Sequence, residues 1–259
     1  MIAIQFLLGI LLGMLVNLLA DSLPFYRRVE GFHCAHCGAP RAVLAWSGIS
    51  AGLSGRRRCE NCATSLSPRT LFIEMVLGIG AVVIGIGAPN ASAYLVQMLV
   101  FSIFLLITVI DIEHRLILHI VSGPAALIIA LIGILDPMRG PEKTLLGGLA
   151  GFGSFLLLYY LGQVFASFMS RRRGETIDEV AFGFGDVTLA GVIGLTVGWP
   201  GVIVALVLGI LAAGFFSLLF IVGMLVRRQY NPFMPIPYGP FLILGSLFVY
   251  FGGVGLVVV

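Results

Sequence analysis

Long apolar runs, separated by short charged stretches or by Pro and Gly, dominate the chain. A helix needs about 20 apolar residues to cross the ~30 Å hydrocarbon core of a bilayer. The pattern predicts about eight spans, of which the sixth is the shortest, at residues 2–20, 70–87, 92–110, 116–135, 144–169, 186–199, 201–226 and 238–257. We therefore expect an all-α polytopic membrane protein.

The composition agrees with this fold class. Of the 259 residues, 59% are apolar and only 10% are charged, which is more apolar surface than a soluble domain of this length can bury. Residues 1–20 lack a basic lead-in and a small-x-small cleavage site. We expect them to form the first transmembrane helix and not a removed signal peptide.

The basic residues predict the orientation. A net charge of +3 is compatible with nucleic-acid binding, but the basic residues fall in short loops between apolar runs, where they report topology. Thirteen of the fifteen lie on one predicted face, and only Arg139 and Lys143 lie on the other. Because short cytoplasmic loops are enriched in Arg and Lys, the rich face is cytoplasmic and both termini lie outside. We expect membrane lipid, and no nucleic acid, as a partner.

Four cysteines follow the pattern C-x2-C-x21-C-x2-C, at Cys34, Cys37, Cys59 and Cys62. Two disulfides are one reading, but two close pairs across such a loop are typical of a tetrahedral thiolate site, and a cytoplasmic loop is reducing. Residues 21–69 are too few to bury a core without a staple. The sequence predicts a zinc-stapled cytoplasmic module at 21–69, between the first helix and a seven-helix membrane core at 70–259.

Two acids carry the candidate chemistry. Asp111 ends the third apolar run and Asp186 begins the sixth, so the topology places both at the same cytoplasmic depth. Two carboxylates close together in a low-dielectric site share a proton and can activate water, as in aspartic proteases. Gly183 and Gly185 would leave room for an extended substrate segment. The alternative is that Asp111 pairs with Arg115 and that Asp186 caps a helix.

A third acid, Glu74, lies near the start of the second run. An ionisable group at membrane depth is costly unless it is paired or hydrated. We interpret Glu74 as a structural partner of an arginine from the cysteine loop.

Several motifs together resemble the type IV prepilin peptidases over essentially the whole chain. They are Gly-Phe-Gly-Asp at 183–186, Asp111 before a charged turn, the double C-x2-C, and Pro-Tyr-Gly-Pro-Phe-Leu at 237–242. The resemblance implies an inner-membrane aspartic endopeptidase with Asp111 and Asp186 as its catalytic pair. It also implies prepilin or pseudopilin substrates, whose new amino terminus many members methylate with S-adenosylmethionine.

This sequence departs from the family pattern in two regions. Thr188 stands where lysine is usual after the second acid, and Leu118 replaces a proline after the first. The family's aromatic-acid-Asn-Ile-Pro stretch is not recognisable in residues 42–53, in the region associated with methylation. We therefore expect cleavage with weak or absent N-methylation.

Two other functions remain open. A presenilin-like protease shares the GxGD motif, but its Tyr-Asp and Pro-Ala-Leu motifs are missing here. An ion-coupled transporter could use the paired acids as a relay, although transport would favour carboxylates spread through the bilayer depth.

Overall fold

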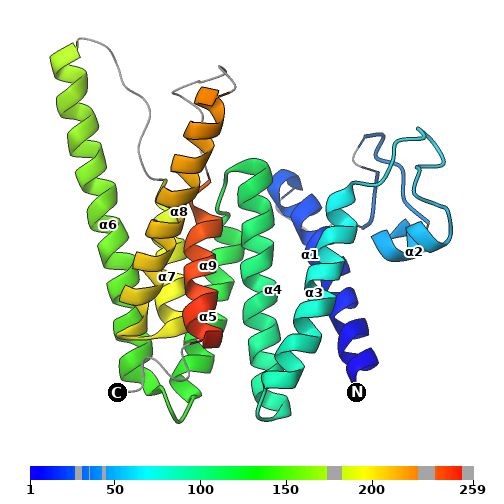
Figure 1. The fold of residues 1–259 in the computed structure, drawn as a ribbon, viewed down its shortest axis with the longest axis horizontal. Helices are drawn as coiled ribbons and strands as arrows, with labels where there is room; N and C mark the ends of the chain where they lie inside the picture. Colours follow the sequence, from blue (N-terminus) through cyan, green and yellow to red (C-terminus); the bar gives the residue numbers. More distant parts are fainter. Residues whose placement is uncertain (27–30, 35, 43–44, 174–182, 227–236, 253–259) are drawn as a thin grey trace. The chain divides into compact units, whose positions relative to one another are not determined.

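The computed structural model describes residues 1–26, 31–34, 36–42, 45–173, 183–226 and 237–252. Within these ranges the chain is helical, and its only strand-like pairings are two isolated antiparallel bridges. Figure 1 labels the helices, which are α1 (Ile2–Tyr26), α2 (Gly48–Leu53), α3 (Pro68–Gly87), α4 (Ala91–His114), α5 (His119–Leu135), α6 (Gly140–Arg173), α7 (Phe184–Val197), α8 (Gly201–Val226) and α9 (Gly239–Gly252).

Each of the eight predicted apolar runs forms a helix. Five of these helices, α1, α3, α4, α6 and α8, contain segments long and apolar enough to cross a membrane. The other three, α5, α7 and α9, are apolar but shorter. At 1.5 Å per residue, the 14 residues of α7 span roughly 21 Å. The chain is an all-α polytopic membrane protein, as the sequence predicts.

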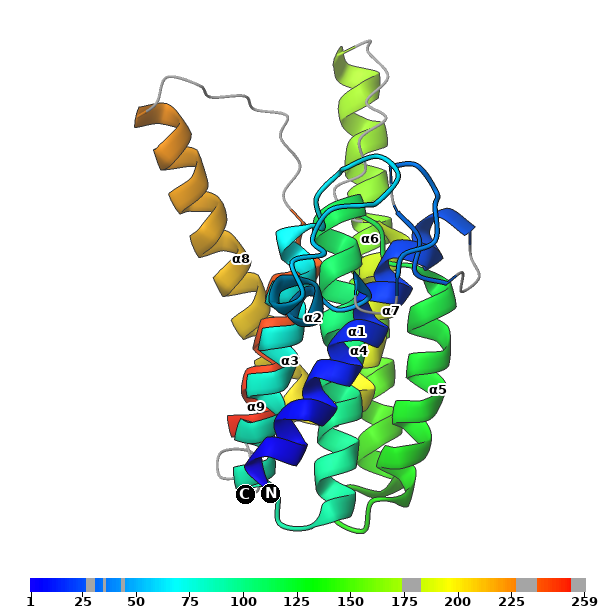
Figure 2. The same cartoon turned by 90° about the vertical axis from the view of Figure 1, so that its right-hand side faces the viewer.

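The chain divides into two compact units, residues 1–110 and 111–259. The three-part division expected from the sequence stays a prediction. In the first unit, α1 packs along α3 (Figure 2) because glycines bring the two backbones together. A β-carbon at Gly13 would lie 2.7 Å from the Cα of Glu74, and Gly9 meets the main chain of Leu77 equally closely. These glycines therefore let the two helices approach closely.

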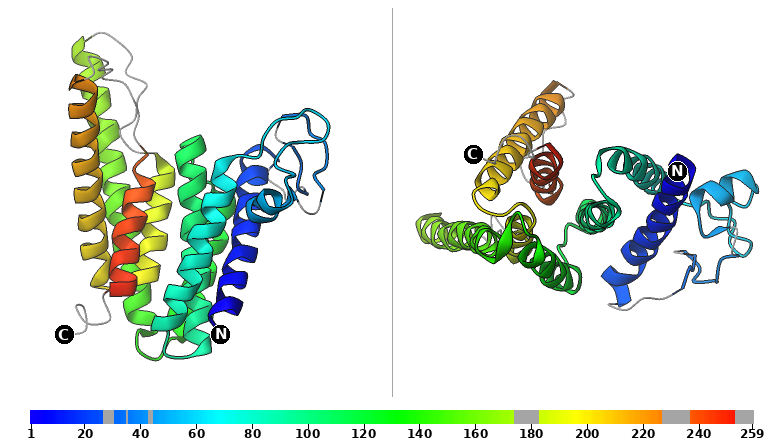
Figure 3. Two further views of the ribbon diagram at one scale, coloured as in Figure 1. Left: turned by 45° about the vertical axis from the view of Figure 1, so that its right-hand side comes forward. Right: turned by 90° about the horizontal axis from the view of Figure 1, so that it is seen from below.

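In the second unit, α7 is the central helix and contacts α5, α6, α8 and α9 (Figure 3). Most of its residues from Val187 to Thr196 are buried. Gly194 of α7 packs directly against Gly147 of α6, and Ala190 packs against Gly151. Because side chains are absent at these contacts, α7 is held tightly, and so is the acid at its start.

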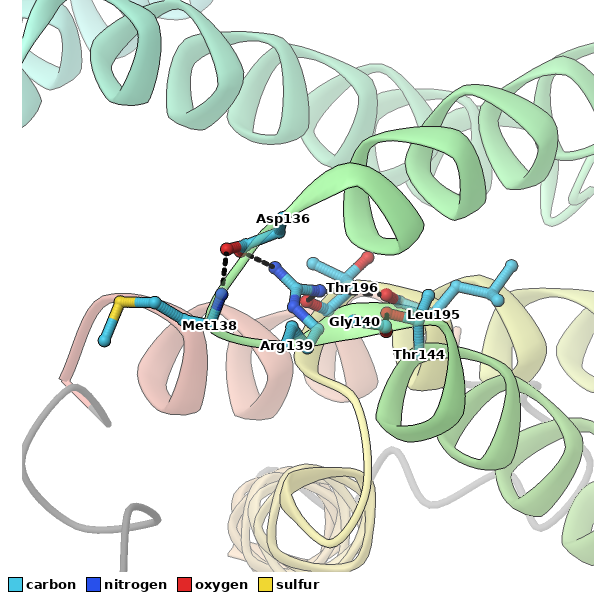
Figure 4. Close-up of polar contacts among 7 residues, drawn as sticks. All are labelled: Asp136, Met138, Arg139, Gly140, Thr144, Leu195 and Thr196. Atoms are coloured by element: carbon cyan, nitrogen blue, oxygen red, sulfur yellow. Dashed lines mark hydrogen bonds and ion pairs between the residues drawn. The ribbon is translucent and has the colours of Figure 1, made fainter.

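The far end of α7 is held by Arg139, in the turn between α5 and α6 (Figure 4). Its guanidinium group donates to the main-chain oxygens of Leu195, at 3.0 Å, and Thr196. It also pairs with Asp136 at 3.7 Å. A cation at a helix C-terminus satisfies free carbonyl groups and the helix dipole, so Arg139 fixes the end of α7 opposite Asp186.

Candidate active site and metal centre

Asp111 lies in the last turn of α4 and is 6% exposed. The helix ends at His114, because Arg115 has a left-handed backbone (φ 54°) and its N–H donates to the Asp111 carbonyl at 2.8 Å. An acid in the last turn opposes the helix dipole. No ion pair joins Asp111 to the exposed Arg115 among the described residues. Helix stability therefore does not explain why an acid stands here.

Asp186 lies in the first turn of α7 and is half-buried. Its Oδ2 accepts a hydrogen bond from the Gly183 N–H at 3.1 Å, and its own N–H donates to the Gly183 carbonyl, also at 3.1 Å. A carboxylate here complements the helix dipole. Asp186 therefore caps α7, as the alternative interpretation states. Capping uses one carboxylate oxygen and leaves the second one available to a further partner.

The two carboxyl groups come together in the second unit. They are near enough for Asp186 to interact electrostatically with Asp111. The first turn of α9 approaches from another side, with the Gly239 N–H facing the Asp111 carboxyl group. Oδ2 of Asp111 has no hydrogen-bond partner within the described part of the chain, although it is buried. A buried acceptor left open in this way is typical of a site that receives a water or a substrate.

The two glycines of the GxGD motif differ in role. Gly183 has an ordinary extended backbone (φ −77°, ψ 153°), and neither glycine has a positive φ. A β-carbon at Gly185 would lie 2.8 Å from the β-carbon of Ile117, so Gly185 allows α7 to pack against the turn that follows Asp111. Neither glycine therefore needs a backbone conformation that is closed to other residues. Whether they bind substrate stays a prediction.

Gly239 is a site residue that sequence reasoning missed. A β-carbon there would lie 2.5 Å from Oδ2 of Asp111. In the sequence, Gly239 belongs to the motif at 237–242, from which only the family resemblance was inferred. A Gly-Pro pair at the start of an apolar run indicates a helix N-terminus, and such a terminus offers N–H groups to an anion.

The four cysteines come together in the first unit. Their sulfur atoms all lie within 4.8 Å of one another, with Cys34–Cys62 at 3.6 Å and Cys37–Cys59 at 3.7 Å. These distances are too long for disulfides, and all four thiols are free. Four converging sulfur ligands can hold a metal ion.

Each cysteine pair lies on a tight turn of the same design. In the first, Cys34 donates its N–H to Ala39 and accepts from Gly38, which has a φ of 69°. In the second, Cys59 donates to Thr64 and accepts from Ala63, which has a φ of 57°. The turns therefore present their thiols in equivalent ways, as two halves of one centre.

The main chain of the first turn also prepares its thiols for metal binding. The backbone N–H groups of Cys37 and His36 lower the pKa of Cys34 to about 6. The Ala39 N–H lowers the pKa of Cys37, but desolvation and the neighbouring thiols outweigh it and raise this pKa to about 11. Crowded thiols resist carrying several negative charges at once, and a bound cation removes that conflict.

Glu74 is fully buried, and it has hydrogen-bond partners where the sequence suggested an arginine. Oε2 accepts from the Ser47 hydroxyl at 2.6 Å and from the Ile49 N–H at 3.1 Å, while Oε1 accepts from the Gly48 N–H at 2.8 Å. The interpretation of an ion pair is wrong. The carboxylate instead caps α2 and fastens the cysteine module to α3.

The comparisons with known proteins agree with this arrangement. Residues 98–219, which include both acids, match the Type IV leader peptidase family. Proteins named prepilin leader peptidase/N-methyltransferase are similar over most of the chain. The one from Aeromonas hydrophila is 23% identical over 87% of this chain and 73% of its own length. The one from Dickeya chrysanthemi is 23% identical over 93% of this chain and 92% of its own. No solved structure matches the chain.

Proposed function

Because this chain belongs to the type IV leader peptidase family and is a protease, we propose that it is an aspartic endopeptidase of the inner membrane. Its substrates are prepilins or pseudopilins, and Asp111 and Asp186 cut their leader peptides at the cytoplasmic face. One observation carries the proposal: two carboxyl groups from separate helices lie close together, and a buried oxygen of one of them has no hydrogen-bond partner among the described residues. The peptidase names of the relatives favour this function over an ion-coupled transporter.

The mechanism follows from sharing one proton between the two carboxyl groups. The ionised partner removes a proton from a water molecule, while the protonated partner donates to the carbonyl oxygen of the scissile bond. Water then adds to the carbonyl carbon, and the leaving amine takes a proton as the bond breaks. The N-termini of α7 and α9 stabilise the negative charge on the pair. Both acids are held by packed helices, so the geometry is prepared in advance.

Cys34, Cys37, Cys59 and Cys62 would hold zinc. A tetrahedral zinc with Zn–S bonds of about 2.3 Å requires sulfur–sulfur separations of roughly 3.8 Å. The separations of 3.6 and 3.7 Å fit this geometry. Four thiolates leave no open coordination position, so the zinc would scaffold the module and take no part in cleavage.

Substitution of each acid tests the proposal. We expect Asp111→Asn and Asp186→Asn each to abolish cleavage of a membrane-embedded prepilin, read by mass analysis of the products, while the protein still inserts and folds. Asp136→Asn is the matched control, because this acid lies in the turn at the other end of α7 and should not affect cleavage. Full activity of either active-site variant would remove the proposed pair.

N-methylation is a second candidate function, favoured by the names of the relatives and by one cavity. The cavity has a volume of about 270 Å³ and lies in the cysteine module, where Arg41, Arg56, Arg58 and Glu60 line it. These charges would suit the carboxylate and the cationic groups of S-adenosylmethionine, which would supply the methyl group. The expectation of weak methylation rests on residues 42–53, whereas most of the charged residues that line the cavity lie at 56–60.

The same product analysis decides this second function. A mature amino terminus that gains one methyl group with the methyl donor present, and loses that gain in Arg58→Ala with cleavage intact, would support methylation. An unmethylated amino terminus would bear out the expectation from the sequence.

A further inference from the structure

Helices α5, α6 and α7 of the second unit line a groove with a volume of about 330 Å³. Each helix lines it with four residues at positions i, i+3, i+4 and i+7, which is one face of an α-helix. On α7 these are Thr188, Gly191, Val192 and Leu195. The series on α5 begins at His119 and ends at Ala126. The groove is therefore a regular, mostly apolar channel along three helices.

One end of the groove lies beside the candidate active site. Thr188 follows Asp186 by half a helical turn, and His119 contacts Phe184, the first residue of α7, at 5.8 Å between ring centroids. From Thr188 to Leu195 the helix rises about 10 Å. An extended peptide covers about 3.3 Å per residue, so the groove matches roughly three extended residues. The length and position of the groove suit a few substrate residues next to a scissile peptide bond that lies at the two acids.

The chemistry of the groove also favours a peptide. A β-carbon at Gly123 would meet nothing within 4 Å, so the groove is open at this position. Ser122, which also lines the groove, is 2% exposed, and its hydroxyl has no partner within the described residues. The Thr188 hydroxyl, by contrast, donates to the Gly185 carbonyl at 2.8 Å. A lipid acyl chain offers Ser122 nothing to bond, whereas an extended peptide carries unpaired amide groups.

We propose that this groove binds the apolar residues of the substrate that adjoin the scissile bond, in extended conformation, with the Ser122 hydroxyl paired to a substrate amide. The proposal rests on the proposed function and adds to it the substrate feature that the enzyme recognises. The groove lining carries no Asp, Glu, Lys or Arg side chain. Charged residues close to the scissile bond on this side should therefore be excluded from the groove, because a charge there would be buried without a partner.

Filling the groove tests the proposal. Gly123→Leu places a bulky side chain in the groove, from a position where a β-carbon meets nothing within 4 Å. We expect it to raise the KM for prepilin in liposomes at least ten-fold, with a smaller change in kcat. Gly153→Leu is the matched control, because Gly153 also has open space around it but lies outside the groove. A short soluble peptide with polar residues next to its scissile bond should be cleaved equally by both variants.

Photocrosslinking identifies the occupant directly. A photoreactive residue at position 123, in the Asp186→Asn background, should form an adduct with the prepilin beside its cleavage site, and one at position 153 should not. Normal cleavage of prepilin by Gly123→Leu, or adducts with lipid alone, would overturn the groove proposal and leave the catalytic pair standing. Conversely, prepilin adducts at position 123 together with full activity of the Asp186→Asn enzyme would support the groove and refute the pair.

Discussion

The main chain of Gly239 packs directly against the carboxyl group of Asp111, so closely that a β-carbon at position 239 would lie 2.5 Å from Oδ2. This contact joins the start of α9 to the end of α4, far apart in the sequence. It brings the Gly239 N–H to a buried acid. In this first turn of α9, Pro240 has no N–H, and the N–H groups of Phe241 and Leu242 already bond to the Tyr238 carbonyl. The distance between the Gly239 main chain and the Asp111 carboxyl group leaves no room for a side chain at position 239.

We therefore expect Gly239→Ala to lower kcat/KM for prepilin cleavage by roughly two orders of magnitude, because a displacement of about 1 Å at a catalytic group has effects of that size. Gly252→Ala, in the same helix but with open space around it, should retain cleavage. Steady-state rates on prepilin in liposomes, with thermal melting as the check on folding, measure both. Equal activity of the two variants would show that Asp111 tolerates displacement.

The two glycines of the GxGD motif should respond differently to alanine. A β-carbon at Gly185 would meet that of Ile117 at 2.8 Å, whereas one at Gly183 would approach Asp186 only to 3.7 Å, an ordinary contact. We expect Gly185→Ala to lower the thermal midpoint and the cleavage rate. The double variant Gly185→Ala/Ile117→Gly should recover part of both losses, because it removes the opposing β-carbon. Equal sensitivity at positions 183 and 185 would point to a substrate contact at Gly183 instead of packing.

The sequence predicts the helices well because a bilayer imposes long apolar runs on any chain that crosses it. The ends of the helices differ from the predicted ends. The helix α6 extends to Arg173, past the predicted end at 169, and α7 begins at Phe184, before Asp186. Hydropathy cannot locate such ends, because charged residues continue a helix into the aqueous phase as readily as they end it.

Candidate residues could be identified where a single residue type implies its chemistry, as for Asp111, Asp186 and the cysteines, and their roles stay predictions. The partners of Glu74 were not, because Ser47 and Gly48 are common residues with no signal of their own. The sequence favoured an arginine on charge alone, whereas the start of α2 offers N–H groups that satisfy a carboxylate equally well. Gly239 was missed for a similar reason, since a glycine's role lies in the neighbour it approaches.

Zinc should be required for the order of the cysteine module. Purified protein should contain about one equivalent of zinc per chain, and Cys37→Ser should lose most of it, because three thiolates hold zinc more weakly than four. His36→Ala is the control and should keep its zinc, since the four thiols complete the site without it. Trypsin should cut the apoprotein faster at Arg56, Arg57 and Arg58. A metal-free protein with unchanged protease resistance would contradict the structural role.

Glu74→Gln should release the cysteine module from α3 without affecting cleavage of a short peptide, because the two acids lie in the other unit. The amide replaces one acceptor oxygen by an NH2 group, which would face donors from Ser47, Gly48 or Ile49. Each hydrogen bond lost from a charged group costs about 1.5–3 kcal/mol, enough to expose α2 to solvent part of the time. Amide hydrogen exchange at residues 48–53 should accelerate at least ten-fold in this variant. In the control Glu60→Gln, the side chain is 80% exposed and exchange should stay at the wild-type rate. If both variants exchange alike, the Glu74 contacts do not hold the module in place.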